Sequence, residues 1–308
     1  MRPILIAALA GAGLFVLAGC ELDELAGSAS VKEDFHYSHA LKPGGRLAVE
    51  TFNGSITISG WDREEVDISG TRQASSKELL DAMKIDIVPT AEAIRIRTVR
   101  PSGWRGNMGA SFTIKAPRRL LVERAQSSNG SVHVEEIEGN VRLETSNGRI
   151  RAVRVRGDVE ATTSNGPVEL TECIGAANLK TSNGRIQADG VRGPFEATTS
   201  NAKIEARLLE VSGSLPVKLR TSNGAIQLTL EQPPKTDVVL TTSNGPITVR
   251  APSSLAATVK ASTSNGQIST SFSVAGEKSR TRLEGTVGAG GPLLELATSN
   301  GSINLEPI

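Results

Sequence analysis

Residues 145–148 read Thr-Ser-Asn-Gly, and the same four residues return at 163–166, 181–184, 221–224, 242–245, 263–266 and 298–301. Near copies stand at 51–54, 127–130 and 199–202. From residue 129 to residue 201 the asparagines are 18 residues apart, and the next three intervals are 22, 21 and 21 residues. Repeats of about 20 residues are typical of solenoids, in which each repeat is one coil stacked on the next.

The residues around each asparagine also repeat. Leu or Ala stands four residues before it and Ile or Val three residues after it, and a second glycine column recurs at Gly139, Gly157, Gly175 and Gly193. Each coil is therefore predicted to run strand, Ser-Asn-Gly corner, strand, glycine corner, with coils about 4.8 Å apart. The predicted fold is all-β, a single-stranded parallel β-helix with about 18–22 residues per coil.

The Ser-Asn-Gly corner is predicted to be structural. Asn and Gly tolerate positive φ angles, and stacked Asn amides can form a ladder that fixes the register. The alternative, a calcium site, needs carboxylate oxygens, which these corners do not supply. Ala202 replaces the corner glycine once and should cost about 1 kcal/mol if its φ is positive. The ladder is expected to comprise Asn129, Asn147, Asn165, Asn183, Asn201, Asn223, Asn244, Asn265 and Asn300.

Composition narrows the function. Aromatic residues make up 3% of the chain, which has 31 glycines, so the core must consist of small aliphatic side chains. With 34 basic and 33 acidic residues the net charge is +1, which predicts no binding to nucleic acid. No pattern indicates a metal or a cofactor.

The N-terminus has the features of a targeting signal. A basic start is followed by an apolar run that is too short to span a membrane, and then by Leu17-Ala18-Gly19-Cys20. This tetrapeptide resembles the bacterial lipobox, which implies that residues 1–19 are a cleaved signal peptide and that Cys20 is lipidated. An ordinary signal peptide with a chance cysteine is the alternative. We expect residues 20–43 to be a flexible tether and the protein to be lipid-anchored in a bacterial envelope, on the outer-membrane or periplasmic side.

The rest of the chain, residues 44–308, is predicted to form one domain. Residues 44–126 lack the strict period and should form irregular coils and a cap, with a short helix over Ser76–Met83 that Ser75 or Ser76 caps. Residues 127–308 should form the regular solenoid. Cys173 falls in an inward aliphatic column, which indicates a buried, unreactive thiol. The final coil is followed only by Glu306-Pro307-Ile308, which predicts an open sheet edge and weak end-to-end association.

Charged residues 18 apart should be neighbours on adjacent coils. Opposite charges then meet, which favours solvated pairs over an anion site. The expected pairs include Arg142 with Glu160, Arg151 with Glu169 and Arg154 with Glu136. Two pairs of carboxylates should also lie two coils apart, at about 9.6 Å, near the separation that an inverting glycosidase uses. These catalytic candidates are Glu160 with Glu196 and Glu169 with Glu205.

The chain resembles the bacterial putative adhesin domain family, β-solenoid domains of unknown function found in envelope proteins. The resemblance covers about residues 45–306 and rests on four segments of the sequence. These are Phe52-Asn53-Gly54-Ser55-Ile56, the stretch from Phe112 to Pro117 leading into Ser127-Ser128-Asn129-Gly130, the serial Thr-Ser-Asn-Gly-x-Ile coils, and the stretch from Leu283 to Gly290 before the last copy. The resemblance implies a parallel β-helix in the envelope and brings no catalytic motif.

Three functions remain open at this point. The first is a non-catalytic envelope lipoprotein whose solenoid serves adhesion or scaffolding, with a glycan or an envelope protein as partner. The second is a sensory or assembly module that binds a protein through the open C-terminal coil. The third is a polysaccharide-active enzyme, which rests on fold analogy and on the two carboxylate pairs.

Overall fold

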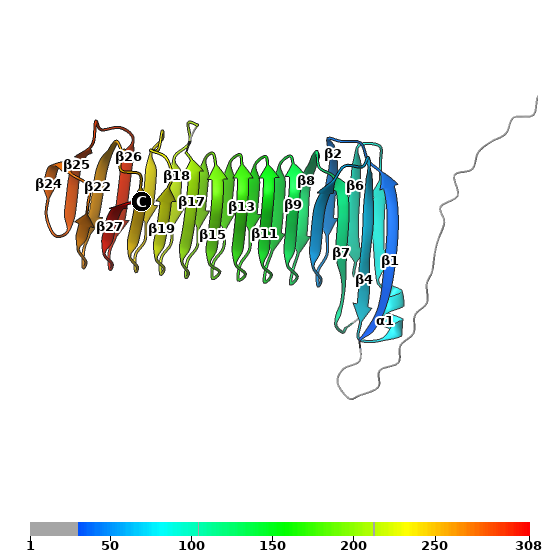
Figure 1. Ribbon diagram of the computed structural model, residues 1–308. Helices are drawn as coiled ribbons and strands as arrows, with labels where there is room; N and C mark the ends of the chain where they lie inside the picture. Colours follow the sequence, from blue (N-terminus) through cyan, green and yellow to red (C-terminus); the bar gives the residue numbers. More distant parts are fainter. Residues whose placement is uncertain (1–29, 104, 212) are drawn as a thin grey trace, which may run out of the picture.

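The protein is a stack of coils formed by a 13-stranded and a 14-stranded sheet that face each other (Figure 1). The computed structural model describes residues 30–103, 105–211 and 213–308. Within the stack, strands of successive coils pair in parallel, as with Ile150 against Val168. The predicted all-β parallel solenoid is confirmed.

The described residues form one short helix, α1 (Lys77–Ala82), and 27 strands. The strands are β1 (Val31–Ala40), β2 (Gly45–Glu50), β3 (Ile56–Trp61), β4 (Glu65–Ala74), β5 (Lys84–Pro89), β6 (Ala93–Val99), β7 (Met108–Pro117), β8 (Leu120–Ser127), β9 (Val132–Glu138), β10 (Val141–Thr145), β11 (Ile150–Arg156), β12 (Val159–Thr162), β13 (Val168–Ile174), β14 (Ala177–Lys180), β15 (Ile186–Arg192), β16 (Phe195–Thr198), β17 (Ile204–Glu210), β18 (Val217–Arg220), β19 (Ile226–Leu230), β20 (Val238–Thr241), β21 (Ile247–Ala251), β22 (Ala257–Thr263), β23 (Ile268–Thr270), β24 (Val274–Lys278), β25 (Arg282–Val287), β26 (Leu293–Thr298) and β27 (Ile303–Pro307).

The core is a narrow aliphatic column between the two sheets. Most strands of the stack alternate inward and outward side chains, as in β10 and β12, so that one face of the strand enters the core. Leu143 and Ile150, on the two strands of one coil, are fully buried, as are their counterparts along the stack. One continuous buried cluster runs from Leu41 to Leu305, so all coils share a single core.

The threonine that opens each motif is buried and bonds to the previous coil. Thr145 donates its hydroxyl hydrogen to the carbonyl oxygen of Gly130 over 2.9 Å, and Thr181 does the same to Gly166 over 3.1 Å. A buried hydroxyl without an acceptor would be costly, so this bond is what allows a polar side chain inside the coil.

The asparagines of the motif form a continuous side-chain ladder. Asn165 donates from Nδ2 to Oδ1 of Asn147 over 2.6 Å and accepts from Nδ2 of Asn183 over 2.7 Å. The ladder starts at Asn53, which accepts from Asn129, and ends at Asn265. In space its members follow the order Asn53, Asn129, Asn147, Asn165, Asn183, Asn201, Asn223, Asn244, Asn300, Asn265.

The corner glycine is needed for a different reason from the one the sequence suggested. Positive φ was the expected reason, but no corner asparagine has a positive φ, and of the glycines that follow them in the described residues only Gly54, in the first near copy, has one, at 158°. A Cβ at Gly166 would instead lie 1.7 Å from the carbonyl oxygen of Gly148 on the neighbouring coil. Ala202 also lacks a positive φ, so the strain expected there is absent, and Asn201 keeps both ladder bonds. Close stacking, not backbone conformation, selects glycine at this corner.

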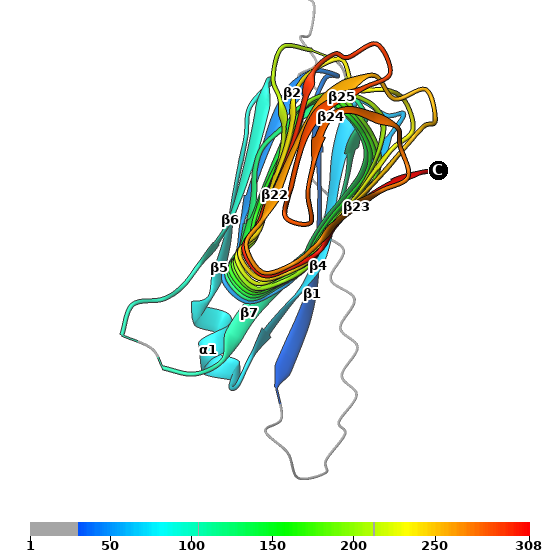
Figure 2. The ribbon, with the colours of Figure 1, turned by 90° about the vertical axis from the view of Figure 1, so that its left-hand side faces the viewer.

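The second glycine corner does require the left-handed region. Gly139, Gly157, Gly175 and Gly193 have φ of 155°, 153°, 143° and 131°. Extra residues in the longer coils are all accommodated at this corner, as in the segment 211–216 between β17 and β18. Viewed along the stack, the bends at the asparagine corner superimpose closely, whereas the loops at the opposite corner spread apart (Figure 2).

The N-terminal end differs from the expected tether. Residues 31–40 form β1, which pairs with β4 along its whole length, so the expected flexible segment ends at or before residue 30. The strand is polar because it lies at the edge of its sheet, and only Phe35 contacts another aromatic ring of the core, that of Phe112. Beside it, α1 begins at the N-cap Ser76, which accepts a hydrogen bond from the backbone of Leu79, as the sequence predicted.

The C-terminal end corrects a second expectation. The last coil in the sequence is not the last in the stack, because β27 lies between β21 and β23, and β26 lies between β20 and β22. The end of the stack is covered by the antiparallel strands β24 and β25, with Phe272 and Val274 packed against the core (Figure 2). The predicted open C-terminal coil is therefore wrong. The first coil is enclosed in the same way, with β2 between β6 and β8.

The ladder makes a graded prediction for stability. Asn165→Ala removes two side-chain bonds and should lower the free energy of unfolding by about 1–3 kcal/mol, whereas Asn265→Ala removes one bond and should cost about half of that. Ser164→Ala, at the neighbouring exposed corner position, is the control and should have little effect. Urea denaturation of the three variants measures the difference. Equal losses for Asn165→Ala and Ser164→Ala would contradict a stabilising ladder.

Candidate binding surfaces

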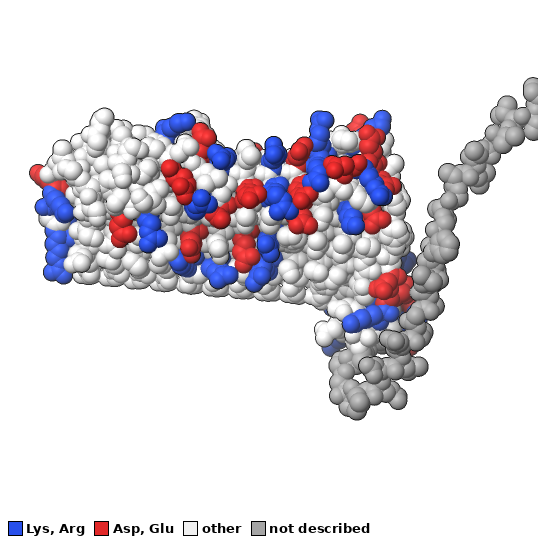
Figure 3. Space-filling view, viewed as in Figure 1, with Lys and Arg blue, Asp and Glu red and all other residues white. Residues whose placement is uncertain are grey.

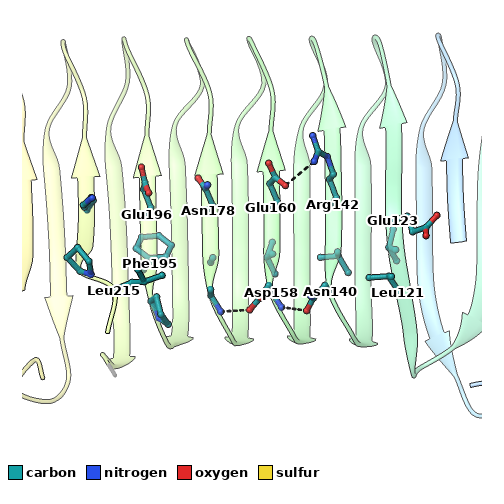
Figure 4. Close-up of a pocket in the computed structure, with 18 residues that line it drawn as sticks. Leu121, Glu123, Asn140, Arg142, Asp158, Glu160, Asn178, Phe195, Glu196 and Leu215 are labelled. Atoms are coloured by element: carbon teal, nitrogen blue, oxygen red, sulfur yellow. Dashed lines mark hydrogen bonds and ion pairs between the residues drawn. The ribbon is translucent and has the colours of Figure 1, made fainter. Parts of the chain in front are cut away.

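Glu160 and Glu196 lie two coils apart on the sheet of shorter strands, as the sequence predicted. Asn178 lies between them, because β12, β14 and β16 pair in register at these positions. Two strand spacings separate the carboxylates by about 9.6 Å along the sheet. Figure 4 shows the three side chains pointing outward in the same direction from neighbouring strands.

Their electrostatic partners differ. Arg142 lies 3.4 Å from Glu160, but it also bonds to Glu144 over 2.7 Å, so it is shared between two carboxylates. In the described residues no lysine, arginine or histidine nitrogen lies within 4 Å of the carboxylate of Glu196. Lys218 is its register neighbour on β18 without forming an ion pair. One carboxylate of this pair therefore has only a shared partner, and the other has none.

Glu169 and Glu205 form the equivalent pair on the opposite sheet, with Gln187 between them. Glu169 is flanked by Arg149 at 3.6 Å and by Arg185 at 3.5 Å, whereas Glu205 pairs with Lys203 at 2.8 Å. The sequence predicted the spacing correctly but expected Arg151 as the partner of Glu169. Arg151 is the register neighbour of Glu169 on β11. The ion pairs come instead from Arg149 and Arg185, which lie just before the strands on either side of Glu169.

A groove of about 520 Å³ surrounds Asn178. It crosses the starts of six parallel strands, from β8 to β18, and is hollowed where Ala176 and Asn178 are shorter than the residues on both sides. Leu215 and Pro216, from the longer coil, form the wall at one end, and Leu215 is 59% exposed. The sequence did not predict this groove. Its one signal was the interval of 22 residues after Asn201, which indicated an added segment in that coil.

At the rim of the groove, side-chain oxygens accept hydrogen bonds from backbone N–H groups of the next coil. Asn140 accepts from the backbone nitrogen of Asp158 over 2.8 Å, and Asp158 accepts from that of Ala176 over 2.9 Å (Figure 4). Each of these residues directly follows a glycine of the second corner. Hydrogen bonds therefore join successive coils at the corner beside the groove. The oxygen Oδ1 of Asn178 is buried and has no hydrogen-bond donor among the described residues.

A second groove, of about 640 Å³, lies on the other sheet along a column of unusual backbone conformation. Glu136, Arg154 and Glu172, spaced by 18 residues, have φ of 58°, 52° and 54°. Such conformations cost free energy at residues other than glycine and persist only where the surroundings impose them. Arg154 bonds to Glu136 over 2.9 Å, as the sequence predicted, and Arg118 bonds to it from the preceding coil. The hydrogen bonds from these two arginines lower the pKa of Glu136.

The remaining charges are interspersed, and the face seen in Figure 3 shows no large area of one sign. The histidines lie apart from one another: His36 contacts Asp67, and His133 contacts Glu135. The described residues contain no cluster of three or more histidine, cysteine, aspartate or glutamate side chains that could hold a metal ion.

The family model for the Toastrack domain, DUF4097, matches residues 45–306. The chain belongs to this family. Comparison with curated proteins finds no match. A putative adhesin from Parabacteroides merdae is 10% identical, with a TM-score of 0.45, over 90% of this chain and 96% of its own.

Two further structures have similar coverage. A putative adhesin from Bacteroides fragilis is 13% identical, with a TM-score of 0.40, over 90% of this chain and 97% of its own. A putative cell adhesion protein from Clostridium sporogenes is 13% identical, with a TM-score of 0.24, over 90% of this chain and 100% of its own. These scores are too low to carry an argument about function. The family assignment agrees with the resemblance found in the sequence.

Cys20 lies outside the described residues, so its lipidation stays a prediction. No helix within the described part of the chain has the length and apolar character needed to cross a membrane. Cys173, by contrast, is fully buried in the inward column between Val155 and Val191. Burial, with a smaller contribution from the charge of Asp158, raises the pKa of its thiol to about 12.

This pKa predicts that Cys173 does not react with thiol reagents while the protein is folded. At pH 8 a thiol-disulfide reagent should modify Cys173 only after unfolding in urea, because the thiolate is the reacting species. The raised pKa also stabilises the folded state below the ordinary cysteine pKa of about 8.5, and this contribution is lost as the pH rises toward 12. Reaction of the folded protein at the rate of an exposed cysteine would show that the column is open.

Proposed function

We propose that the Toastrack domain of this chain is held at a bacterial envelope membrane by a lipid on Cys20 and serves adhesion or scaffolding without catalysing a reaction. The observation that carries the proposal is a rigid stack with a continuous core, fixed corners and both ends closed, which presents its side chains in straight columns. Proteins of this construction use extended surfaces for binding.

The chain direction supports anchoring at the N-terminal end. The first described strand, β1, starts beside α1 at one extremity of the molecule, and most of the strands that line the two grooves, such as β12 and β15, lie farther along the stack (Figure 1). Two or more acyl chains on Cys20 would give stable attachment, whereas one would be marginal. The anchor and the binding surfaces would then be separated along the same molecule.

Anchoring is tested in cells that express the full chain or its Cys20→Ala variant. The wild-type protein should fractionate with membranes and carry acyl groups at a mature N-terminus of Cys20, as detected by mass spectrometry. The Cys20→Ala protein should be released in soluble form. A wild-type chain cleaved elsewhere and free of lipid would contradict the anchor.

The binding role is tested with the purified full chain carrying Cys20→Ala on an array of glycans and envelope polymers, with products checked by mass spectrometry. We expect binding without turnover. The enzymatic alternative rests on the carboxylate pairs, of which Glu160 and Glu196 share a groove. Turnover that is abolished by Glu160→Gln or Glu169→Gln would replace the adhesion proposal with a polysaccharide-active enzyme.

A further inference from the structure

The groove around Asn178 combines carboxylates at a regular spacing with an apolar wall. We propose that it binds an extended peptide in the polyproline II conformation that carries lysines three residues apart. The inference rests on the proposed binding function of the stack and names the site and the ligand class. It is carried by the carboxylate columns, by the apolar wall and by the dimensions of the groove.

The charges point to a cationic ligand. Glu160 shares Arg142 with Glu144, and Glu196 has no cationic nitrogen within 4 Å among the described residues, although Lys218 is its neighbour on β18. The charged side chains of the lining are the four carboxylates of Glu123, Asp158, Glu160 and Glu196 and the two cations of Arg142 and Lys218, so negative charge is in excess. Asp158 adds a third negative charge at the rim, where its carboxylate is already bonded to a backbone nitrogen. An ammonium group brought into the groove would find two carboxylates whose charges the protein leaves incompletely balanced.

The spacing selects the conformation of the ligand. The carboxylate columns of Glu160 and Glu196 are two strand spacings apart, at about 9.6 Å. In a polyproline II helix, residues i and i+3 point in the same direction and are separated by about 9.3 Å. A fully extended strand returns to the same face every two residues, at about 6.8 Å, and fits the columns less well.

The walls suit the stem of a lysine side chain. Leu215, Pro216 and Pro194 line the groove, and the one aromatic residue of the lining, Phe195, is 1% exposed. Lysine packs its methylene stem on apolar surface and keeps its ammonium near charged groups. A sugar ring would find no exposed aromatic platform here, which favours a peptide over an amino-sugar polymer.

Asn178 lies where the backbone of such a peptide would pass. Its Oδ1 has no donor among the described residues, and rotation of the amide exchanges the positions of its oxygen and nitrogen. Because this oxygen is buried, the side chain must turn toward the groove before its amide can bond to a backbone carbonyl or N–H between the two lysines. The groove spans six strands, or about 24 Å, which accommodates a hexapeptide of about 19 Å.

The test uses the purified full chain carrying Cys20→Ala and the fluorescent peptide Pro-Lys-Pro-Pro-Lys-Pro. Fluorescence anisotropy should show saturable binding that is at least about tenfold weaker in the Glu160→Gln/Glu196→Gln variant, the loss expected for charge-assisted bonds. The matched control is Glu169→Gln/Glu205→Gln, which removes the same charges at the same spacing from the opposite sheet and should bind within about twofold of the parent chain. Leu215→Ala, at the exposed wall, should also weaken binding.

Peptide controls test the spacing itself. Pro-Lys-Pro-Lys-Pro-Pro, with the same charge, places its lysines on different sides of the helix and should bind at least about fivefold more weakly, since one ammonium loses its carboxylate. The inference is overturned by equal affinity for the two peptides, by equal loss in the two double variants, or by binding of an amino-sugar oligomer without peptide binding. None of these results bears on anchoring through Cys20, which the cell fractionation measures separately.

Discussion

The close approach of successive coils at the asparagine corner is the constraint on which the rest of the structure depends. At this corner the side chain of Asn147 bonds to that of Asn165, and the hydroxyl hydrogen of Thr163 is directed at the carbonyl oxygen of Gly148. A side chain on Gly166 would occupy the same space as that oxygen. Three of the four motif residues thus act across coils, which is why the motif recurs as a unit and why the register is fixed there.

Fixing one corner leaves the other free to vary. The segments between the sheets at the asparagine corner stay nearly constant in length, whereas those at the glycine corner grow from residues 157–158 to residues 211–216. The groove around Asn178 lies beside such an added segment, and Leu215 comes from it. The asparagine corner therefore stabilises the stack, while the glycine corner carries the segments that vary. Binding residues are commonly found on such variable segments of a rigid scaffold.

Both ends of the stack are closed by the same topological device. The first and last coils of the chain are each inserted between coils that are distant in sequence, so β2 and β27 have neighbours on both sides. Unpaired sheet edges promote association with other chains. Here the edge positions fall to β1 and β5 at one end and to β23 and β24 at the other, and β1 and β24 carry charged side chains.

The sequence by itself determined the coil, because the spacing of Thr-Ser-Asn-Gly reports a contact between neighbours that repeats unchanged. The same spacing of 18 residues predicted that Glu160, Asn178 and Glu196 lie side by side, because residues at equal positions in successive coils must pair. The tertiary structure alone decided the position of β27 and the pairing of β1, because strands without a repeat partner are placed by long-range contacts. It also decided the groove, whose wall at Leu215 depends on where an added loop folds relative to coils that precede it in the chain.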